Sequence, residues 1–246
     1  MKRILTIFLF LTVGYLAAQP DSLFTEANEA YRTENYRQAA ELYRALADSG
    51  YQNEALFYNL GNSYYQSGQI GESILYFEKA LSIDPDDEET RQNLDIVRKR
   101  TVDEFEVMPD SVLQTAGRSI LRFFSPDQWT FLALFLLALI PLSLFVYFFS
   151  PMKRLGFTGL LIGLILGGTC LALAYGHRNW QKHNQGAIIM SPSAYVKSAP
   201  ASSSEDVLIL HEGTKAVVVE KLDEWRKIRL PDGKLGWIKA ADLAMI

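Results

Sequence analysis

The chain contains little cysteine and histidine, and its net charge is only -4. Its one cysteine, Cys170, cannot form an intramolecular disulfide, so cysteine content gives no information about the redox compartment. The three histidines, His177, His183 and His211, do not occur at a metal-ligand spacing with cysteine or carboxylate partners. We therefore expect neither a metal site nor a cofactor.

The sequence motifs of common enzymes are also missing. Residues 202–204 are consecutive serines, but no nucleophile elbow and no phosphate-binding glycine loop is present. We expect no catalytic residues and a protein that is not an enzyme. Residues 19–128 contain 20 acidic and 10 basic side chains, and residues 176–246 contain 8 acidic and 10 basic ones. Neither part is basic enough to indicate nucleic acid as a partner.

Two long apolar runs occupy residues 129–149 and 155–175. Each has 21 residues without a charged side chain, and as a helix each would extend about 32 Å, enough to cross roughly 30 Å of hydrocarbon. We expect two transmembrane helices, with the lipid bilayer as a partner. Residues 150–154 form a short cytoplasmic loop, so the helices must be antiparallel, and Pro141 could kink the first one.

The second apolar run contains glycine at every fourth position. Gly159, Gly163 and Gly167 fall on one helix face, where a neighbouring helix can approach closely. These glycines are the predicted helix-packing residues. These glycines would allow either the two helices of the hairpin to pack closely on each other or this face to contact another membrane protein.

The N-terminal residues have the layout of a secretory signal peptide, predicted to be residues 1–18. Lys2 and Arg3 precede the apolar stretch Ile4–Leu16, which two alanines follow. An uncleaved anchor is the alternative. Export would place residues 19–128 outside the cytoplasm, and the hairpin would return the C-terminal part to the same side.

Residues 23–85 repeat at an offset of 34 residues. The matching pairs are Leu23 and Phe57, Ala27 and Gly61, Ala30 and Tyr64, Glu34 and Gly68, Tyr36 and Ile70, Ala39 and Ser73, Tyr43 and Phe77, Leu46 and Ala80. This pattern resembles the tetratricopeptide repeat, a helix, turn and helix of that length. We expect an all-α domain over residues 19–104, closed by a capping helix at about residues 87–100.

The resemblance implies a concave face that accepts an extended or helical peptide. On the family pattern this partner-binding face includes Asn28, Tyr31, Asn59, Asn62 and Tyr65. Asn28 and Asn59 match positions at which a subclass of these repeats holds a terminal carboxylate. The basic residues of that clamp are absent, since their positions are occupied by Phe24, Glu89 and Asn93. The acidic composition therefore favours a basic or apolar partner segment.

Two connecting segments flank the hairpin. Residues 105–128 are predicted to be an amphipathic linker, either an interfacial helix or a packing helix. Residues 176–185 are predicted to be a second linker.

Residues 186–246 alternate short apolar stretches with turn residues, including a hairpin turn at residues 231–233. The stretch from Trp225 to Trp237, with Gly233 and Gly236, resembles the bacterial SH3-like barrel. Tyr195, Trp225 and Trp237 belong either to a ligand groove or to the barrel core. A groove of this kind would bind cell-wall peptide.

The predicted fold class is a multidomain membrane protein with an all-α repeat domain, two transmembrane helices and a small all-β SH3-like barrel. This order of parts, including the entry to the hairpin at residues 125–129, resembles the E-protein family of the Bacteroides aerotolerance operon. The resemblance implies a bacterial inner-membrane protein with both domains in the periplasm. It also implies von Willebrand A-domain membrane proteins and a MoxR-type ATPase as partners. The resulting hypothesis is a non-enzymatic scaffold, and the alternative is a peptidoglycan-binding sensor or anchor.

Overall fold

The computed structural model describes residues 19–105, 117, 121 and 123–246. The predicted signal peptide and most of the predicted 105–128 linker lie outside the described residues. The chain divides into two compact units. One combines Met1–Glu106 with Gln185–Ile246, and the other is Val107–Asn184.

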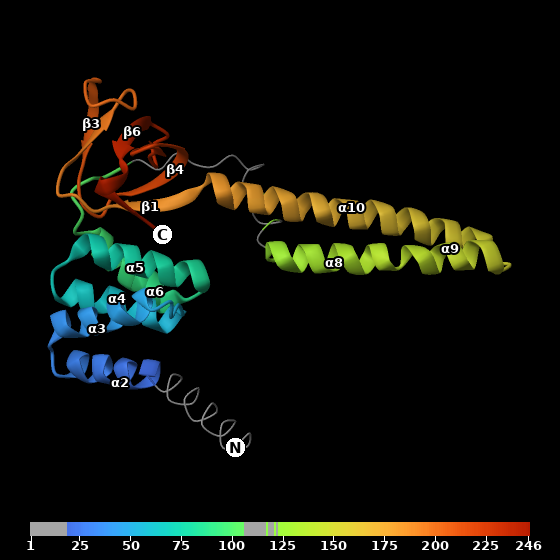
Figure 1. Ribbon diagram of the computed structural model, residues 1–246, viewed down its shortest axis with the longest axis horizontal. Helices are drawn as coiled ribbons and strands as arrows, with labels where there is room; N and C mark the ends of the chain where they lie inside the picture. The colour runs from blue at the N-terminus through green and yellow to red at the C-terminus, as the bar shows by residue number, and fades with distance from the viewer. Residues whose placement is uncertain (1–18, 106–116, 118–120, 122) are drawn as a thin grey trace, which may run out of the picture. The chain divides into compact units, whose positions relative to one another are not determined.

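Within residues 19–105 of the first unit, five helices follow one another (Figure 1). They are α2 (Gln19–Arg32), α3 (Tyr36–Asp48), α4 (Glu54–Gln66), α5 (Ile70–Ile83) and α6 (Glu88–Arg98). The helix pairs α2–α3 and α4–α5 are the two predicted repeats, and α6 is the predicted cap. The side chain of Asp87 accepts hydrogen bonds from the Glu89 and Thr90 amides, which fixes the start of α6.

Small residues allow the paired helices to approach each other. A Cβ atom added to Gly61 on α4 would lie 2.7 Å from the ring of Phe77 on α5. The Ser73 hydroxyl donates a buried 2.8 Å hydrogen bond to the Gly61 carbonyl. Phe77 and Tyr43, which occupy matching positions in the two repeats, are almost fully buried. The residues that define the 34-residue period therefore form the repeat core.

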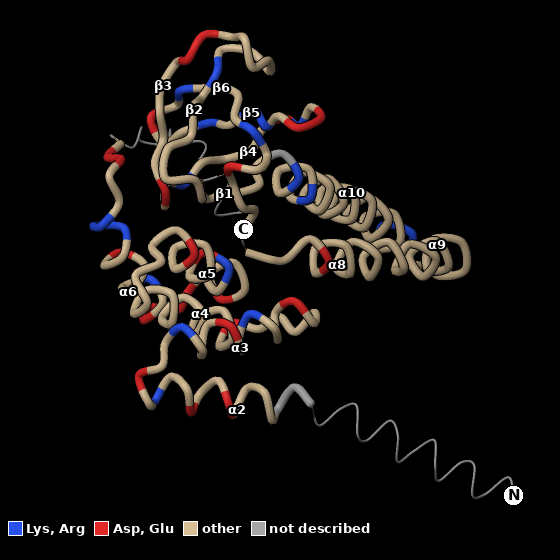
Figure 2. Tube along the Cα trace, turned by 60° about the vertical axis from the view of Figure 1, so that its left-hand side comes forward, with Lys and Arg blue, Asp and Glu red and all other residues tan. Residues whose placement is uncertain are grey.

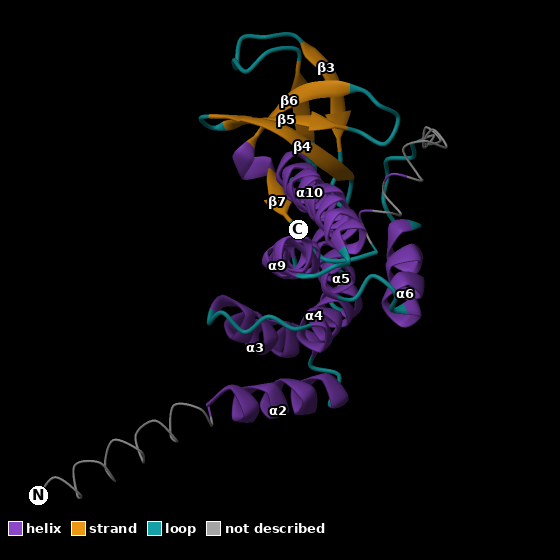
Figure 3. Cartoon of the chain, turned by 90° about the vertical axis from the view of Figure 1, so that its right-hand side faces the viewer, coloured by secondary structure: helices purple, strands orange, loops and turns teal. Residues whose placement is uncertain are grey.

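Seven antiparallel strands form the C-terminal part of the first unit (Figure 3). They are β1 (Gln185–Ile189), β2 (Ala194–Lys197), β3 (Asp206–Leu210), β4 (Lys215–Leu222), β5 (Trp225–Arg229), β6 (Leu235–Lys239) and β7 (Leu243–Met245). Their order in the sheet is β3-β2-β6-β5-β4-β1-β7. The predicted turn at residues 231–233 joins β5 to β6, with Gly233 at φ 86°. The sequence analysis did not predict β7, a strand of three residues that pairs with β1.

The hydrophobic core of the repeats extends into the strand domain at one edge. Ile188 on β1 is fully buried in the same cluster as Leu60, Ile74 and Phe77 of the repeats. Met190, Ala244 and Ile246 are partly buried and pack against that cluster. Strand β1 lies beside α5 (Figure 1). The parts of the chain before and after the apolar hairpin therefore form a single body.

The second unit contains the apolar hairpin of α8 (Pro126–Ala138), α9 (Ile140–Phe149) and α10 (Lys153–His183). Ser125 and Gln128 form a capping box at the start of α8. The first apolar segment is interrupted at Leu139, two residues before Pro141, which lacks a backbone donor. Pro126–Phe149 and Lys153–Lys182 are long and apolar enough to cross a membrane. Charged residues are confined to the ends of these helices (Figure 2).

The second helix is longer than its apolar run. Most of the segment 176–185, which was predicted to be a linker, belongs to α10, because this helix continues to His183. No proline interrupts this stretch, and backbone hydrogen bonding continues through its polar residues. Arg178 on the added turns forms a 2.6 Å ion pair with Asp127 on α8.

The glycine face of α10 packs against the first apolar segment. A Cβ atom added to Gly159 would lie 2.8 Å from the Ser143 hydroxyl, and one added to Gly167 would lie 2.9 Å from the Leu137 side chain. At Gly163 the nearest atoms would be 3.4 Å away. The structure thus places all three glycines between the hairpin helices. An added side chain would disturb the packing at Gly159 and Gly167, whereas at Gly163 a Cβ atom would make ordinary van der Waals contact.

Candidate functional site

On the family pattern, the predicted concave face is lined by α2 and α4, the first helices of the two repeats, and by the capping helix α6. Hydrogen bonds inside the domain occupy several of its polar groups. The Tyr43 hydroxyl donates a 2.5 Å hydrogen bond to Asn28 Oδ1, which ties α3 to α2. The Tyr31 hydroxyl is hydrogen-bonded to Gln66, and burial, together with the neighbouring Tyr36, raises the pKa of Tyr31. These contacts position Asn28 and Tyr31 within the repeat.

A row of contacts joins α4 to the capping helix α6. The Tyr58 hydroxyl donates to the Glu89 carboxylate, and the Asn93 amide donates to Tyr58 and to Asn62 Oδ1. Burial, followed by the hydrogen bond to Glu89, raises the pKa of Tyr58. These bonds fasten the cap to the second repeat and occupy part of the Asn62 side chain.

Two of the five predicted face residues keep their side-chain polar groups available. Within the described part of the chain, neither the Asn59 amide nor the Tyr65 hydroxyl makes a hydrogen bond. Both side chains are half-buried on α4. The guanidinium of Arg100 lies 4.8 Å from the Tyr65 ring centroid. Sequence reasoning missed Arg100, because it follows the capping helix and lies outside the family pattern.

A network of hydrogen bonds and ion pairs holds the repeats to the strands. Glu78 on α5 is buried, and its carboxylate lies 2.5 Å from Arg98 on α6 and 2.6 Å from Lys215 on β4. The Glu212 carboxylate accepts a 2.7 Å hydrogen bond from the Gly71 amide in the first turn of α5. The preceding N-cap residue of α5 makes no such side-chain bond, so the strand domain supplies this helix with its cap.

A second anchor joins the segment after α6 to the loop before β4. Asp103 accepts hydrogen bonds from the His211 amide and ring Nδ1, each 2.7 Å long, and from the Thr214 hydroxyl at 2.5 Å. Burial alone would raise the pKa of Asp103, but these hydrogen bonds together hold it below its usual range. No local sequence pattern indicated the pairing, because Asp103 and His211 are far apart in the chain.

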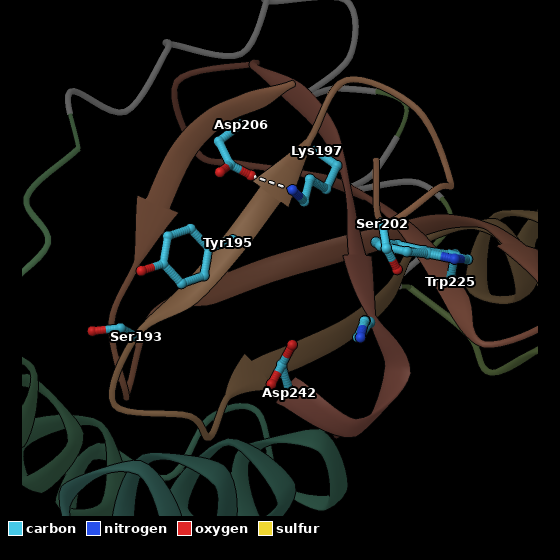
Figure 4. A pocket seen from close by; sticks show the side chains of 8 residues that line it. Ser193, Tyr195, Lys197, Ser202, Asp206, Trp225 and Asp242 are labelled. Carbon is cyan, nitrogen blue, oxygen red and sulfur yellow. Dashed lines mark ion pairs between the residues drawn. The ribbon is translucent and has the colours of Figure 1, made fainter. Parts of the chain in front are cut away.

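The strand domain contains a hollow of about 460 Å³ (Figure 4). Its lining residues are Ser193, Tyr195, Lys197, Ser202, Asp206, Trp225, Lys239 and Asp242. Lys197 and Asp206, which are paired on the neighbouring strands β2 and β3, form a 2.7 Å ion pair at one end of it (Figure 4). Tyr195 is 53% exposed, whereas Trp225 is only 5% exposed. Aromatic and charged groups therefore meet in one concave surface.

The two predicted tryptophans do not belong to the central cluster of the barrel. The strand register pairs Lys227 with Trp237 and Trp225 with Lys239, so these four side chains share one face of the sheet. The fully buried Ile228 of the central core lies on the other face. Trp225 lines the hollow, whereas Trp237 lies 5.6 Å from the Lys227 ammonium and outside the hollow.

Comparisons with known proteins identify both modules. Residues 24–88 match the tetratricopeptide repeat family, and residues 192–244 match the bacterial SH3 domain family. No curated protein matches the chain. Among solved structures, an NlpC/P60 family protein from Bacillus cereus is similar, with 15% identity and a TM-score of 0.22. That alignment covers 27% of this chain and 21% of the other chain. The chain thus contains tetratricopeptide repeats and, after the hairpin, a bacterial SH3 domain, as the sequence predicted.

Proposed function

We propose that the protein is a non-enzymatic scaffold, anchored by α8–α10 in a bacterial inner membrane, with its repeats and SH3 domain together in the periplasm. The observation that carries this proposal is the burial of Ile188 in the repeat core. Segments that share a core must occupy the same compartment. A membrane-spanning hairpin inserted between them must therefore cross the bilayer twice, and the signal-like N-terminal residues favour the periplasmic side.

The surface of the hairpin supports the membrane assignment. Large apolar side chains remain exposed along it, among them Phe131, Phe135, Phe148 and Leu155, each more than 60% exposed. Exposed apolar surface of this extent is unfavourable in water, and lipid would cover it. The backbone polar groups of the helices are satisfied internally, as a hydrocarbon environment requires.

The scaffold role rests on the concave face of the repeats, which exposes Asn59 and Tyr65 to a partner. The resemblance to the aerotolerance family favours von Willebrand A-domain membrane proteins and a MoxR-type ATPase system as partners. In this proposal the repeats bind a segment of one such protein, and the hairpin holds the complex at the membrane.

A mild-detergent pull-down of the tagged full chain from its own membranes tests this function. We expect von Willebrand A-domain or ATPase partners to be recovered with the native chain and lost when Tyr31, Asn59 and Tyr65 are replaced. A triple variant at exposed Arg32, Glu41 and Glu88 serves as the matched control. Unchanged recovery with the altered face would contradict the scaffold. An enzyme reporter fused after Ile246 should be active in the periplasm, and activity restricted to the cytoplasm would contradict the topology.

The hollow in the SH3 domain favours a second candidate function, which is binding of cell-wall peptide. Tyr195 offers an exposed ring beside charged groups of both signs, as a peptide ligand would require. The test is sedimentation of the detergent-solubilised full chain with wall sacculi. We expect Tyr195→Ala and Lys239→Gln to reduce sedimentation, and Lys234→Gln, in the turn outside the hollow, to leave it unchanged. Absence of sedimentation of the native chain would remove this candidate.

A further inference from the structure

From the position of Arg100 above Tyr65 we infer that the concave face binds a carboxylate group carried by an extended segment of a partner protein. This inference rests on the proposed scaffold function and names the chemistry of the partner. It also departs from the sequence-based expectation of a basic or apolar partner segment, which rested on the acidic composition of the repeats and on the absence of the family's basic clamp residues. The structure brings a guanidinium to the same face from a different part of the chain.

The guanidinium of Arg100 has N–H groups that are available to a ligand. It forms no ion pair with any described residue, whereas nearby Arg98 is paired with Glu78 and Asp95. The guanidinium carbon lies 4.8 Å from the Tyr65 ring centroid, and within the described residues no acceptor takes up the N–H groups at the edge of the guanidinium plane. A carboxylate can accept two parallel hydrogen bonds from that edge without displacing the ring.

The backbone on both sides of Arg100 is fixed. The amides of Arg100 and Thr101 donate 2.9 and 3.1 Å hydrogen bonds to the last carbonyls of α6. Two residues further on, Asp103 is anchored to the SH3 domain through His211 and Thr214. The SH3 domain thus helps to position the arginine on the repeats. A fixed cation loses less conformational entropy on binding than a mobile one.

Asn59 defines the orientation of the bound segment. Its free amide can both donate to and accept from a peptide backbone. Asn59 and Tyr65 are six residues apart on α4, which is about 9 Å along the helix axis at 1.5 Å per residue. An extended peptide advances about 3.3 Å per residue, so its carboxylate would lie about three residues from the backbone group held by Asn59. The carboxylate can belong to an acidic side chain or to the C-terminus.

Affinity selection with the full chain in detergent micelles tests the inference. Three pools of synthetic octapeptides serve as probes, each randomised over uncharged residues. The first ends in a free carboxylate, the second ends in an amide and contains one glutamate, and the third ends in an amide and has no acid. We expect the native chain to enrich the first or the second pool over the third. The preferred pool identifies the source of the carboxylate.

The variants make the test specific to Arg100. Arg100→Met removes one charge-assisted bidentate contact and should reduce peptide enrichment about tenfold. Arg100→Lys should restore only part of that enrichment. Lys99→Met, which removes the neighbouring exposed charge, should bind as the native chain does. Equal enrichment of the three pools, no enrichment of any pool, or full binding by Arg100→Met would overturn the inference. If Asn59→Ala abolishes binding and Arg100→Met does not, the scaffold surface stands and only the carboxylate assignment fails.

Discussion

The Glu78 carboxylate on α5 lies 2.6 Å from the Lys215 ammonium on β4, although 137 residues, including the whole hairpin, separate them in the chain. The Glu78 side chain is only 7% exposed, so removal of its cations would leave a desolvated charge. Arg98 contacts the same carboxylate from α6. One buried acid thus connects the second repeat, the cap and the SH3 domain.

Removal of both cations should destabilise the protein more than the sum of the single changes. Lys215→Met or Arg98→Met alone should lower the free energy of unfolding by about 1–2 kcal/mol, because the other cation still neutralises Glu78. The double variant leaves the carboxylate buried without a counter-charge. Chemical denaturation of the detergent-solubilised chain checks this in a double-mutant cycle. Additive losses would show that the two cations act independently.

Gly213 lies where the SH3 loop closely approaches the repeats and the segment after α6. It has φ 86°, and an added Cβ would lie 2.7 Å from Thr101 and 2.9 Å from Ile74. Gly213→Ala should therefore cost about 2–3 kcal/mol from overpacking and backbone strain together. Gly50→Ala is the matched control, because Gly50 has φ 93° with no atom within 4 Å of the added Cβ. That control should lose only about 1 kcal/mol. Similar losses at the two sites, measured by thermal unfolding, would contradict a close domain contact.

Acid should weaken the anchor at Asp103. Its pKa in the folded protein is below the ordinary value of 3.8, so its contribution to stability is complete above pH 3.8 and is lost as the pH falls through the folded-state pKa. The free energy of unfolding of the native chain should fall between pH 5 and pH 2 more steeply than that of Asp103→Asn. Parallel curves for the two proteins would show that Asp103 does not titrate with folding.

The end of α2 offers a stabilising substitution. Glu34 has φ 62° at the position where the second repeat has Gly68 with φ 82°, and the backbone hydrogen bonds after both helices match. Glu34→Gly should raise stability by about 0.5–1 kcal/mol, since relief of left-handed strain exceeds the added entropy of the unfolded chain. Gly68→Ala should lower stability by about 1 kcal/mol. A loss of stability in Glu34→Gly would mean that the side chain contributes an interaction of its own.

Two adjacent glycines distinguish the inner and outer faces of α10. Gly167→Ala would place a Cβ 2.9 Å from Leu137, whereas an added Cβ at Gly168 meets no atom within 4 Å. The first change should weaken the hairpin by about 1–3 kcal/mol, and the second should have little effect. Titration with a denaturing detergent, followed by circular dichroism, measures both. Equal effects would contradict the packing of this face against the first apolar segment.

Features that depend on local periodicity could be predicted from the sequence. The 34-residue offset located the paired helices, because residues such as Gly61 and Phe77 are required by one repeat unit. The strand and turn pattern predicted the SH3 domain for the same reason. Strand β7 was missed because only three residues form it, and its pairing with β1 stabilises it.

Contacts between distant segments had no counterpart in the sequence pattern. Asp103 follows the capping helix without a motif of its own, and its partner His211 is fixed only by the folded arrangement. Arg100 likewise reaches Tyr65 only because α6 packs beside α4. The sequence therefore indicated the helix face of the candidate site, but not the positive charge of Arg100 beside it.

The shared core around Ile188 also sets an order of events during synthesis. Helix α5 is made well before the strands that cover it, and the hairpin must be produced in between. Until β1 and Ile246 are made, the part of α5 that packs against β1 is uncovered, and Glu78 has only Arg98 as a counter-charge. The repeats consequently reach their final stability only after the last strand has been translated, and chaperones have access to the incomplete half throughout that interval.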